Sequence, residues 1–295
     1  MGAATVTVLG ATGKTGRAVA LAALRRGLVV RGVSRHGPPS PRGDDGPAAG
    51  SDRGTDDLPA GVDRFLADPL TGEGLVDALT GADAAYLVAP NVHPAEVDLV
   101  ARAARVATEV GVARVVHHSV ADPDDARMPH HVRKGRAERL LRELRPDAVV
   151  LRPCAYQQNL LPAALAGRIE VPYRLDAPFS LVDLDDVAEV AASALAGGLE
   201  PGSTHVLAGP EELTVADLAE TAARVLGRPV AATATTVERW RAGPGSGLGP
   251  GAAEELAAMF RAYDESGFPA DPGPLARLLG RPPISWAELL RRHTR

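Results

Sequence analysis

The sequence predicts an α/β fold in which a doubly wound, mostly parallel sheet is followed by a smaller, mainly helical C-terminal region. Three observations lead to this prediction. Short β-branched runs alternate with helix-like segments through the first half of the chain, a glycine-rich turn joins the first strand to the first helix, and the alternation loosens after Pro153. With 295 residues, the chain is long enough for one large domain or two smaller ones.

The first elements form one β-α-β unit. Residues 5–9 (TVTVL) are a short β-branched run that predicts a buried strand. Residues 14–26 are rich in Ala and Leu at helical spacing, and Gly27 provides a helix end. Residues 28–34 predict a second strand, so the opening has the size and order of a parallel crossover unit.

The alternation resumes after a polar segment. Residues 36–61 are dense in Gly, Pro, Asp and Ser and offer little apolar surface to bury, so we expect a flexible surface loop, either a lid or, as the favoured alternative, a tolerated insertion. Beyond it, the pattern predicts strands at 63–66, 84–88, 114–117 and 148–151 and helices at 74–80, 95–110 and 134–144. Repeated alternation of this kind is typical of a doubly wound sheet.

The chain after Pro153 is predicted to contain more helix than strand. Thr214 is a candidate N-cap for a helix at 214–226, and residues 243–251 (GPGSGLGPG) predict a flexible link. The other predicted elements are helices at 187–195, 252–263 and 274–279 and a strand at 204–207.

Composition excludes several classes of protein. The formal net charge of −5 gives no electrostatic preference for nucleic acid or for an anionic membrane. No apolar run reaches the length of about 18 residues that a membrane span requires, and no basic segment precedes the first strand as a signal peptide would. The single cysteine, Cys154, rules out an internal disulfide framework and fits a reducing compartment, so we expect a cytoplasmic protein. Whether it is a monomer or a homodimer stays open.

The turn between the first strand and the first helix carries the clearest functional signal. Its glycines satisfy three needs of a dinucleotide site, namely a tight turn, close approach of the backbone to a pyrophosphate, and close packing of helix on strand. The helix start then offers free N–H groups and a positive dipole end to the phosphates. This context predicts a Rossmann-type cofactor site rather than a ligand-free glycine turn, and its residues are Gly10, Thr12, Gly13, Lys14, Thr15 and Gly16.

The end of the second predicted strand indicates which nicotinamide cofactor binds. A carboxylate at this place would accept from the ribose 2′-OH of NAD, but the sequence has Ser34, Arg35 and His36. Arg35 can pair with a 2′-phosphate, and Lys14 can add a second positive charge, so we predict NADP(H). The alternative is that Arg35 is an ordinary solvated charge.

Residues after the next two strands complete the predicted cofactor site. Asp68 is placed either to accept from the adenine amino group or to stabilise a turn, and the sequence gives the two roles equal weight. Pro90 and Asn91 are expected to line the cofactor site by position alone. We therefore assign residues 1–152 to an NADP-binding domain with an insertion at 36–61. Residues 153–295 form a substrate region, from which parts of 178–207 return to the first domain.

Four segments together resemble a known family. The opening VLGATGKTG, the strand end VVHHSV, the segment LRPCAYQQN and the stretch FSLVDLDDVAEVAA are similar to NmrA-like proteins, which are atypical members of the short-chain dehydrogenase/reductase superfamily. The resemblance extends to about Leu207. It implies a Rossmann core, usually NADP(H), and a small C-terminal substrate region. Some relatives reduce quinones, ketones or imines, whereas others are described as cofactor sensors that regulate partners.

The superfamily comparison also implies catalytic positions. The usual reductase has a serine followed by Tyr-x-x-x-Lys, in which the tyrosine donates a proton, the lysine lowers its pKa and holds the ribose, and the serine orients the substrate. Ser119 and Lys134 occupy the serine and lysine places, but the tyrosine place holds His130. The ordinary acid is therefore absent, although Lys134 can still contact the ribose.

Three outcomes follow from the missing tyrosine. His130 or His131 could donate the proton, the proton could come from water or from the substrate, or the protein does not turn over. For either histidine alone, a polar pair in a surface loop is the favoured alternative. Tyr156 is expected near the nicotinamide, either as packing or as the acid. Gln157 and Asn159 are candidates to orient a substrate carbonyl.

Other residue types indicate no further chemistry. Cys154 lacks a His/Asp arrangement around it and is interpreted as a small buried hydrophobe, and no ligand spacing predicts a metal site. The sequence therefore favours an NAD(P)H-dependent reductase that transfers hydride to a carbonyl, a ketone or quinone, of a bulky small molecule, with a ketoreductase of secondary metabolism as one form. The alternative is a non-catalytic NADP(H)-sensing regulator that binds a protein partner, and an epimerase or isomerase is a weaker third hypothesis.

Overall fold

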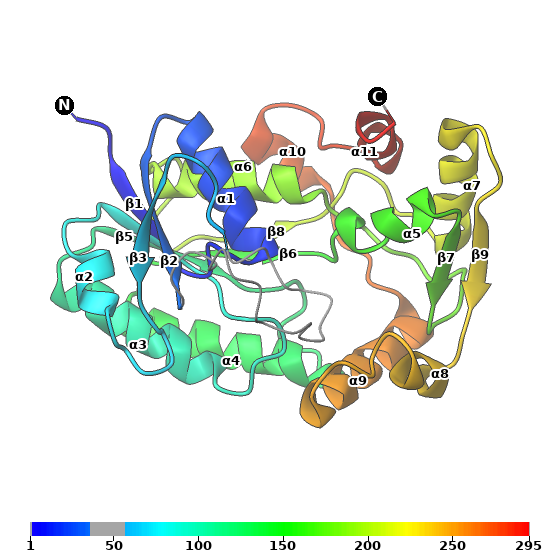
Figure 1. Ribbon diagram of the computed structural model, residues 1–295, viewed down its shortest axis with the longest axis horizontal. Helices are drawn as coiled ribbons and strands as arrows, with labels where there is room; N and C mark the ends of the chain where they lie inside the picture. Colours follow the sequence, from blue (N-terminus) through cyan, green and yellow to red (C-terminus); the bar gives the residue numbers. More distant parts are fainter. Residues whose placement is uncertain (1, 36–56, 295) are drawn as a thin grey trace, which may run out of the picture. The chain divides into compact units, whose positions relative to one another are not determined.

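A seven-stranded sheet organises the first part of the chain. The structure is a computed structural model that describes residues 2–35 and 57–294 (Figure 1). Within these residues the strand order is β3-β2-β1-β4-β5-β6-β8. The strands are β1 (Thr5–Val8), β2 (Val29–Ser34), β3 (Val62–Leu66), β4 (Ala84–Leu87), β5 (Arg114–His118), β6 (Val149–Pro153) and β8 (Thr204–Leu207).

The strand pairs from β3 to β6 run parallel, which confirms the predicted doubly wound sheet. β8 joins the edge of β6, where the Val150 amide donates to the Ser203 carbonyl at 2.9 Å. The order of strands reverses between β1 and β4, which both pair with their neighbours in parallel. In such sheets the carboxyl ends of the two strands at the reversal form the ligand-binding crevice.

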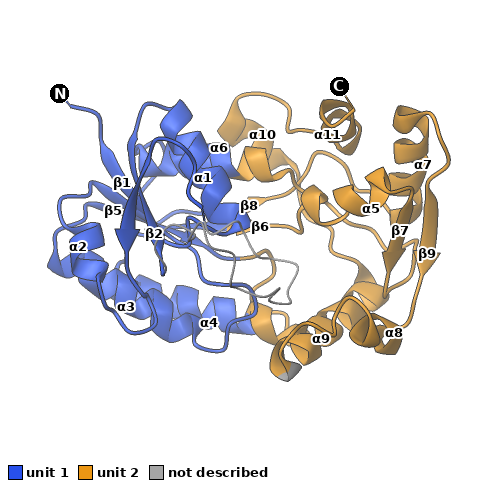
Figure 2. Ribbon diagram, in the orientation of Figure 1, with its two compact units in different colours: residues 1–119, 132–151, 188–204 blue, residues 120–131, 152–187, 205–295 orange. Residues whose placement is uncertain are grey.

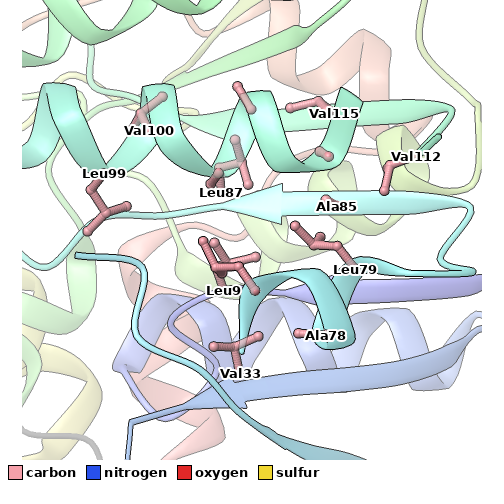
Figure 3. Close-up of a cluster of buried hydrophobic side chains, with 14 of the residues drawn as sticks. Leu9, Val33, Ala78, Leu79, Ala85, Leu87, Leu99, Val100, Val112 and Val115 are labelled. Carbon is pink, nitrogen blue, oxygen red and sulfur yellow. The ribbon is translucent and has the colours of Figure 1, made fainter. Parts of the chain in front are cut away.

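Helices cover both faces of this sheet. α2, α3 and α4 lie on one face and α1 and α6 on the other (Figure 1). Their bounds are α1 (Lys14–Arg25), α2 (Leu75–Leu79), α3 (Glu96–Glu109), α4 (Pro129–Leu144) and α6 (Leu184–Leu195). Leu9, Leu87 and Leu99 pack in the core between the sheet and α2–α4 (Figure 3). Full burial of one such side chain contributes about 1.5–3 kcal/mol.

Contacts divide the chain into two units, coloured in Figure 2. The first unit comprises residues 1–119, 132–151 and 188–204, and the second comprises 120–131, 152–187 and 205–295. The second unit contains a parallel two-stranded sheet and several helices. These are a 3-10 helix (Gln157–Asn159), α5 (Leu161–Leu165), β7 (Arg168–Val171), α7 (Val215–Leu226), β9 (Ala231–Ala234), α8 (Val237–Ala242), α9 (Pro250–Ser266), α10 (Gly273–Leu279) and α11 (Trp286–Arg292).

Local sequence signals account for some of these helices. Thr214 is the N-cap of α7, as predicted, and its hydroxyl accepts from the Asp217 amide at 3.1 Å while the Asp217 carboxylate accepts from the Thr214 amide at 2.9 Å. This reciprocal pair is a capping box, which satisfies two helix-end donors. An aromatic cluster including Tyr173, Phe179 and Tyr263 forms a core in the same unit, with ring centroids 5.2–5.7 Å apart.

The structure differs from the predicted elements in a helix boundary and in short elements that the sequence did not predict. α4 begins at Pro129, not at Lys134. Its first turn is polar, so the sequence shows no helical spacing of apolar residues there, although the histidines of this turn are buried in the structure. The sequence also did not predict β7 and β9, which are four residues each and pair across more than sixty positions of sequence, Arg168 opposite Ala231. Most of the predicted insertion at 36–61 lies outside the described residues, as does His36. Among the helices that the structure describes, none has the length and apolarity needed to cross a bilayer.

Candidate active site

The glycine turn after β1 has the backbone geometry that its spacing predicts. Gly10 has a φ of +72°, which side-chain-bearing residues rarely adopt. A Cβ at Gly16 would lie 2.2 Å from the Gly10 carbonyl oxygen, so only glycine lets α1 pack this closely on the end of β1. At Gly13 the nearest atom to an added Cβ is 3.4 Å away, which is an ordinary van der Waals contact, so close packing does not require this glycine.

The start of α1 is suited to an anion. Gly13 is the N-cap and has no side chain to satisfy the amides of the first turn, and no acidic residue lies in that turn. The positive end of the helix dipole favours a phosphate at this place. Thr12, Lys14 and Thr15 are half-buried around it. The turn therefore fits a dinucleotide diphosphate on the evidence of its own geometry.

Two arginines lie near the end of β2, one directly after the strand and one on β3. Arg35 is exposed directly after the strand. The buried hydroxyl of Ser34 accepts from Arg64 Nη1 at 2.9 Å, and Arg64 Nη2 lies 3.3 Å from Asp57 Oδ1. Arg64 was missed by sequence analysis, because only the register of β3 against β2 brings it beside Ser34.

The loops after β3 and β4 hold the other predicted cofactor residues. Asp68 Oδ1 accepts from the Leu70 amide at 2.8 Å, which is the turn role, and the half-buried carboxylate retains a second oxygen. Pro90 and Asn91 are exposed after β4. The next residue, Val92, is buried with a φ of +52°, a rare conformation for a β-branched residue that tends to cluster at functional sites.

Ser119 follows β5 directly and is bound to a carboxylate. Its buried hydroxyl donates a short hydrogen bond to Glu138 Oε1 on α4. The hydroxyl hydrogen that would orient a substrate carbonyl in the usual reductase is thus directed to Glu138 in this structure. Glu138 was not among the predicted site residues.

Lys134 is also held by a carboxylate. Its ammonium nitrogen lies 2.6 Å from Oε1 of Glu96, the first residue of α3, and both side chains are buried. The neighbouring ring of His117 on β5 is fully buried. Burial first, and then the charge of Lys134, lower the pKa of His117 to about 3, so this imidazole is neutral.

A second buried pair lies at the end of β5. The Tyr86 hydroxyl is 2.6 Å from His118 Nδ1, and both side chains are buried. Burial, followed by the charges of Lys134 and His117, holds the pKa of His118 well below its usual range. His117 and His118 therefore contribute neutral hydrogen-bonding groups beside Lys134 and no positive charge of their own.

The inward side of α4 links these groups. Polar residues recur at every fourth position of the helix, which places them on one side of it, and they are His130, Lys134, Glu138 and Arg142. Arg142 donates to the Thr204 hydroxyl and to the Gly202 carbonyl. Buried polar groups at such density are costly unless paired and often mark a functional site. We call these four residues the polar stripe of α4.

The histidine pair was predicted wrongly as a surface loop. His130 and His131 lie in the first turn of α4 in the second unit and are buried. Their rings meet edge to face at 4.5 Å, His131 packs on Phe268 at 5.5 Å, and its Nδ1 lies 3.0 Å from the Ala121 carbonyl oxygen. His131 thus has a structural role.

The LRPCAYQQN segment contributes mainly structure. Tyr156 is half-buried and bridges to Val182. The Gln157 amide is buried and donates to the Leu181 and Ile284 carbonyls at 3.2 and 3.1 Å, so its expected role in orienting a substrate is not supported. Burial, followed by the charge of Asp122, raises the pKa of Cys154 to about 12, which makes it a poor nucleophile.

One cavity lies within the second unit, at the carboxyl ends of β7 and β9. Its volume is about 550 Å³, and Tyr173, Arg174, Thr236, Arg261 and Asp264 are among its lining residues. None of the predicted site residues lines it. Across the part of the chain that the structure describes, no group of three or more His, Cys, Asp or Glu side chains is arranged to hold a metal ion.

A glycine turn suited to a phosphate, at the end of β1 in a doubly wound parallel sheet, defines the class as a Rossmann-like α/β protein. The chain belongs to the NmrA-like family, whose model matches residues 2–288. This finding confirms the resemblance drawn from the four sequence segments.

Individual relatives are more distant. The chain is 32% identical over 157 residues to a (4-alkanoyl-5-oxo-2,5-dihydrofuran-3-yl)methyl phosphate reductase of Streptomyces griseus, a match that covers 52% of this chain and 55% of the relative, about half its length. It is 26% identical over 241 residues to an NAD(P)H azoreductase of Xenophilus azovorans, covering 79% and 83% of the two chains. An NADPH-bound quinone oxidoreductase of Escherichia coli has the same fold, with a TM-score of 0.79, 20% identity and coverage of 98% and 100%.

Proposed function

We propose that this protein is an NADP(H)-dependent reductase that transfers hydride to the carbonyl, a ketone or quinone, of a bulky small molecule. The single observation that carries the proposal is the turn after β1. There Gly10 and Gly16 are required by the fold, whereas Gly13, the N-cap of α1, leaves space for a pyrophosphate at the positive end of the helix. Membership of the NmrA-like family supports the same assignment.

The cofactor is NADP(H). The amides of the first turn of α1 would hold its diphosphate, with Thr12, Lys14 and Thr15 around it. Arg35 would pair with the 2′-phosphate, because the end of β2 lacks the carboxylate that NAD requires. Asp68, Pro90 and Asn91 would line the remainder. The relatives named for NAD(P)H or solved with NADPH support this choice.

Lys134 and Ser119 would act at the reacting end. When bound, NADPH supplies the hydride. The Lys134 ammonium, partnered by Glu96, would hold the ribose next to the nicotinamide and add positive charge where an alkoxide develops. The Ser119 hydroxyl donates to Glu138, so its oxygen can still accept a hydrogen bond from a substrate. To donate to a substrate, the hydroxyl would have to give up its hydrogen bond to Glu138.

Two side chains of this protein are candidate proton donors. His130 precedes Lys134 by one turn of α4 and belongs to the same polar stripe, and Tyr156 is the half-buried phenol of the second unit. A proton taken from water or from a substrate hydroxyl is the alternative. The relatives' names, which cover a dihydrofuran phosphate, azo compounds and a quinone, support a planar conjugated acceptor.

A direct assay tests the proposal. The protein is mixed with NADPH and a panel of aromatic ketones, quinones and azo compounds, and the absorbance of NADPH is followed. We expect oxidation of NADPH with at least one ketone or quinone. Tight NADPH binding without reduction of any acceptor would count against a reductase. Failure to bind either NADPH or NADH would remove the cofactor assignment as well.

Substitutions assign the roles within the same assay. Ser119→Ala should lower turnover by about 100- to 1000-fold, typical of one lost polar contact in the transition state, while the affinity for NADPH stays nearly unchanged. His130→Phe and Tyr156→Phe distinguish the two proton donors. If neither variant loses activity, water or the substrate supplies the proton.

The missing tyrosine also supports a second candidate function. An NADP(H)-sensing protein needs the turn after β1 and Arg35 but no proton donor. It would bind a protein partner differently in the presence of NADP⁺ and of NADPH. A pull-down that recovers the same proteins, or none, with both nucleotides would contradict this candidate.

A further inference from the structure

Glu96 and Lys134 form an ion pair that is buried, although carboxylate and ammonium groups are costly to bury. Glu96 has no exposed surface, and Lys134 is 7% exposed. Glu96 Oε1 contacts the ammonium at 2.6 Å, while its Oε2 is buried without a hydrogen-bond partner among the described residues. A buried carboxylate at this position is therefore not explained by packing, and its one direct ionic partner in the described structure is Lys134.

We propose that Glu96 is the positioning residue of the nicotinamide end of the site, where it keeps the Lys134 ammonium protonated and fixed so that nucleotide binding does not depend on pH through the neutral range. This inference rests on the proposed function, because it assumes that Lys134 contacts the cofactor. It assigns a role to a residue that the glycine turn and the Ser–Lys arrangement do not identify.

Among the neighbours of Lys134, Glu96 is the one whose carboxylate pairs directly with the ammonium. On β5, His117 and His118 face it as neutral rings. On α4, His130 and Glu138 lie one turn before and after it, and the Glu138 carboxylate accepts from the Ser119 hydroxyl. The ion pair with Glu96 is thus the direct source of negative charge that offsets the desolvation of the ammonium.

Glu96 is more deeply buried than Lys134, so it would act on a bound nucleotide through Lys134 rather than by direct contact. Glu96 and His117 are both 0% exposed, so a ligand at the surface of this unit cannot contact them directly. Lys134, by contrast, retains 7% exposure. An ammonium has three donors, and Glu96 Oε1 takes one of them, so the others are available to ribose hydroxyls.

Removing the carboxylate charge should therefore introduce a pH dependence. A buried ammonium that has lost its carboxylate gives up its proton at a lower pH, and the neutral amine then binds the nucleotide more weakly. In Glu96→Gln, affinity for NADP⁺ should be within about threefold of the wild type at pH 6 and at least about tenfold weaker at pH 9, where a tenfold change corresponds to one decade in Kd.

The experiment is calorimetric titration of the full-length protein with NADP⁺ between pH 6 and 9. Glu109→Gln, at the exposed end of the same helix α3, is the matched control and should follow the wild type. Lys134→Met should bind weakly at every pH. The melting temperature of the nucleotide-free proteins is measured at each pH, so that a loss of folded protein is recognised.

The outcomes are distinct. If Glu96→Gln follows the wild-type pH profile, or loses affinity by one constant factor at every pH, Glu96 has only a structural role and the inference is wrong. Should Glu96→Gln fail to fold, Glu96→Asp, which keeps the charge but shortens the reach, takes its place. It should lose affinity at high pH by a smaller factor, and a profile parallel to the wild type would overturn the inference. If the wild type binds no NADP⁺ at any pH, the proposed function fails instead.

Discussion

The glycine turn after β1 and the polar stripe of α4 rest on different kinds of interaction. The turn works through the backbone, because Gly10 and Gly16 remove side chains so that α1 approaches the strand and presents its amides. The stripe works through buried side chains, because Lys134 and Glu138 each depend on a partner from another element.

This difference determines how each region responds to change. A backbone site tolerates no added atom at its closest approach, but it has no charge to lose. A buried ion pair depends on its geometry, and it becomes costly when one member is removed, since the other remains charged in a poorly solvated place. Substitutions in the two regions should therefore fail for different reasons.

The largest effect is expected in the polar stripe. Lys134→Met leaves the Glu96 carboxylate buried without its cation, which costs about 3–5 kcal/mol when one partner of a buried pair is removed. Urea unfolding at pH 8 measures the loss. The double variant Glu96→Leu/Lys134→Met removes both charges and should recover most of the stability, so equal stabilities of the single and double variants would contradict a costly unpaired charge.

The glycine turn should fail sterically. Gly16→Ala places a Cβ 2.2 Å from the Gly10 carbonyl oxygen, and the forced shift of backbone should cost about 3 kcal/mol. Gly13→Ala has 3.4 Å of clearance, so it should keep the melting temperature while it weakens NADPH binding. Gly251→Ala, where an added Cβ meets nothing within 4 Å, is the control. Equal melting temperatures for all three variants would show that the close packing at Gly16 does not matter.

The two histidines beside Lys134 should make stability depend on pH. His117 is neutral in the folded protein because its pKa is lowered from 6.5 to about 3, whereas the unfolded chain binds a proton below pH 6.5. Stability is therefore fully present above pH 6.5 and falls as the pH drops toward 3, by about 1.4 kcal/mol per pH unit for each such histidine. The free energy of unfolding, measured between pH 7 and 4, should decline less steeply in His117→Gln. The exposed His293 provides the control, and an unchanged slope in His117→Gln would contradict the assignment.

The smallest expected effect concerns the exposed edge of the cofactor site. Arg35→Glu should weaken NADPH by about tenfold, or about 1.4 kcal/mol, through loss of a charge-assisted contact and repulsion of the 2′-phosphate. NADH, which lacks that phosphate, should be nearly unaffected. Fluorescence titration of both nucleotides measures the difference, with Arg105→Glu on the exposed surface of α3 as the control. Equal losses for the two nucleotides would remove Arg35 from the specificity site.

Much of the fold was predictable because its signals are local. The alternation of strand and helix, the glycine spacing and the Thr214 cap each depend on residues within one or two turns of chain. The positions of Ser119 after β5 and of Lys134 on the following helix also agree with the structure. By contrast, the surface placement of His130 and His131 was wrong, since contact with Phe268 from far along the chain buries His131.

The sequence by itself determined the alternation of strands and helices and the glycine spacing after β1, because both depend on neighbouring residues. Only the tertiary structure decided which carboxylates hold Lys134 and Ser119 and that Arg64 reaches Ser34. Glu96 lies 38 positions before Lys134, and Glu138 lies 19 positions after Ser119. Such partners are chosen by the packing of α3 and α4 on the sheet, where burial makes an unpaired charge costly, and no periodicity in the sequence records that choice.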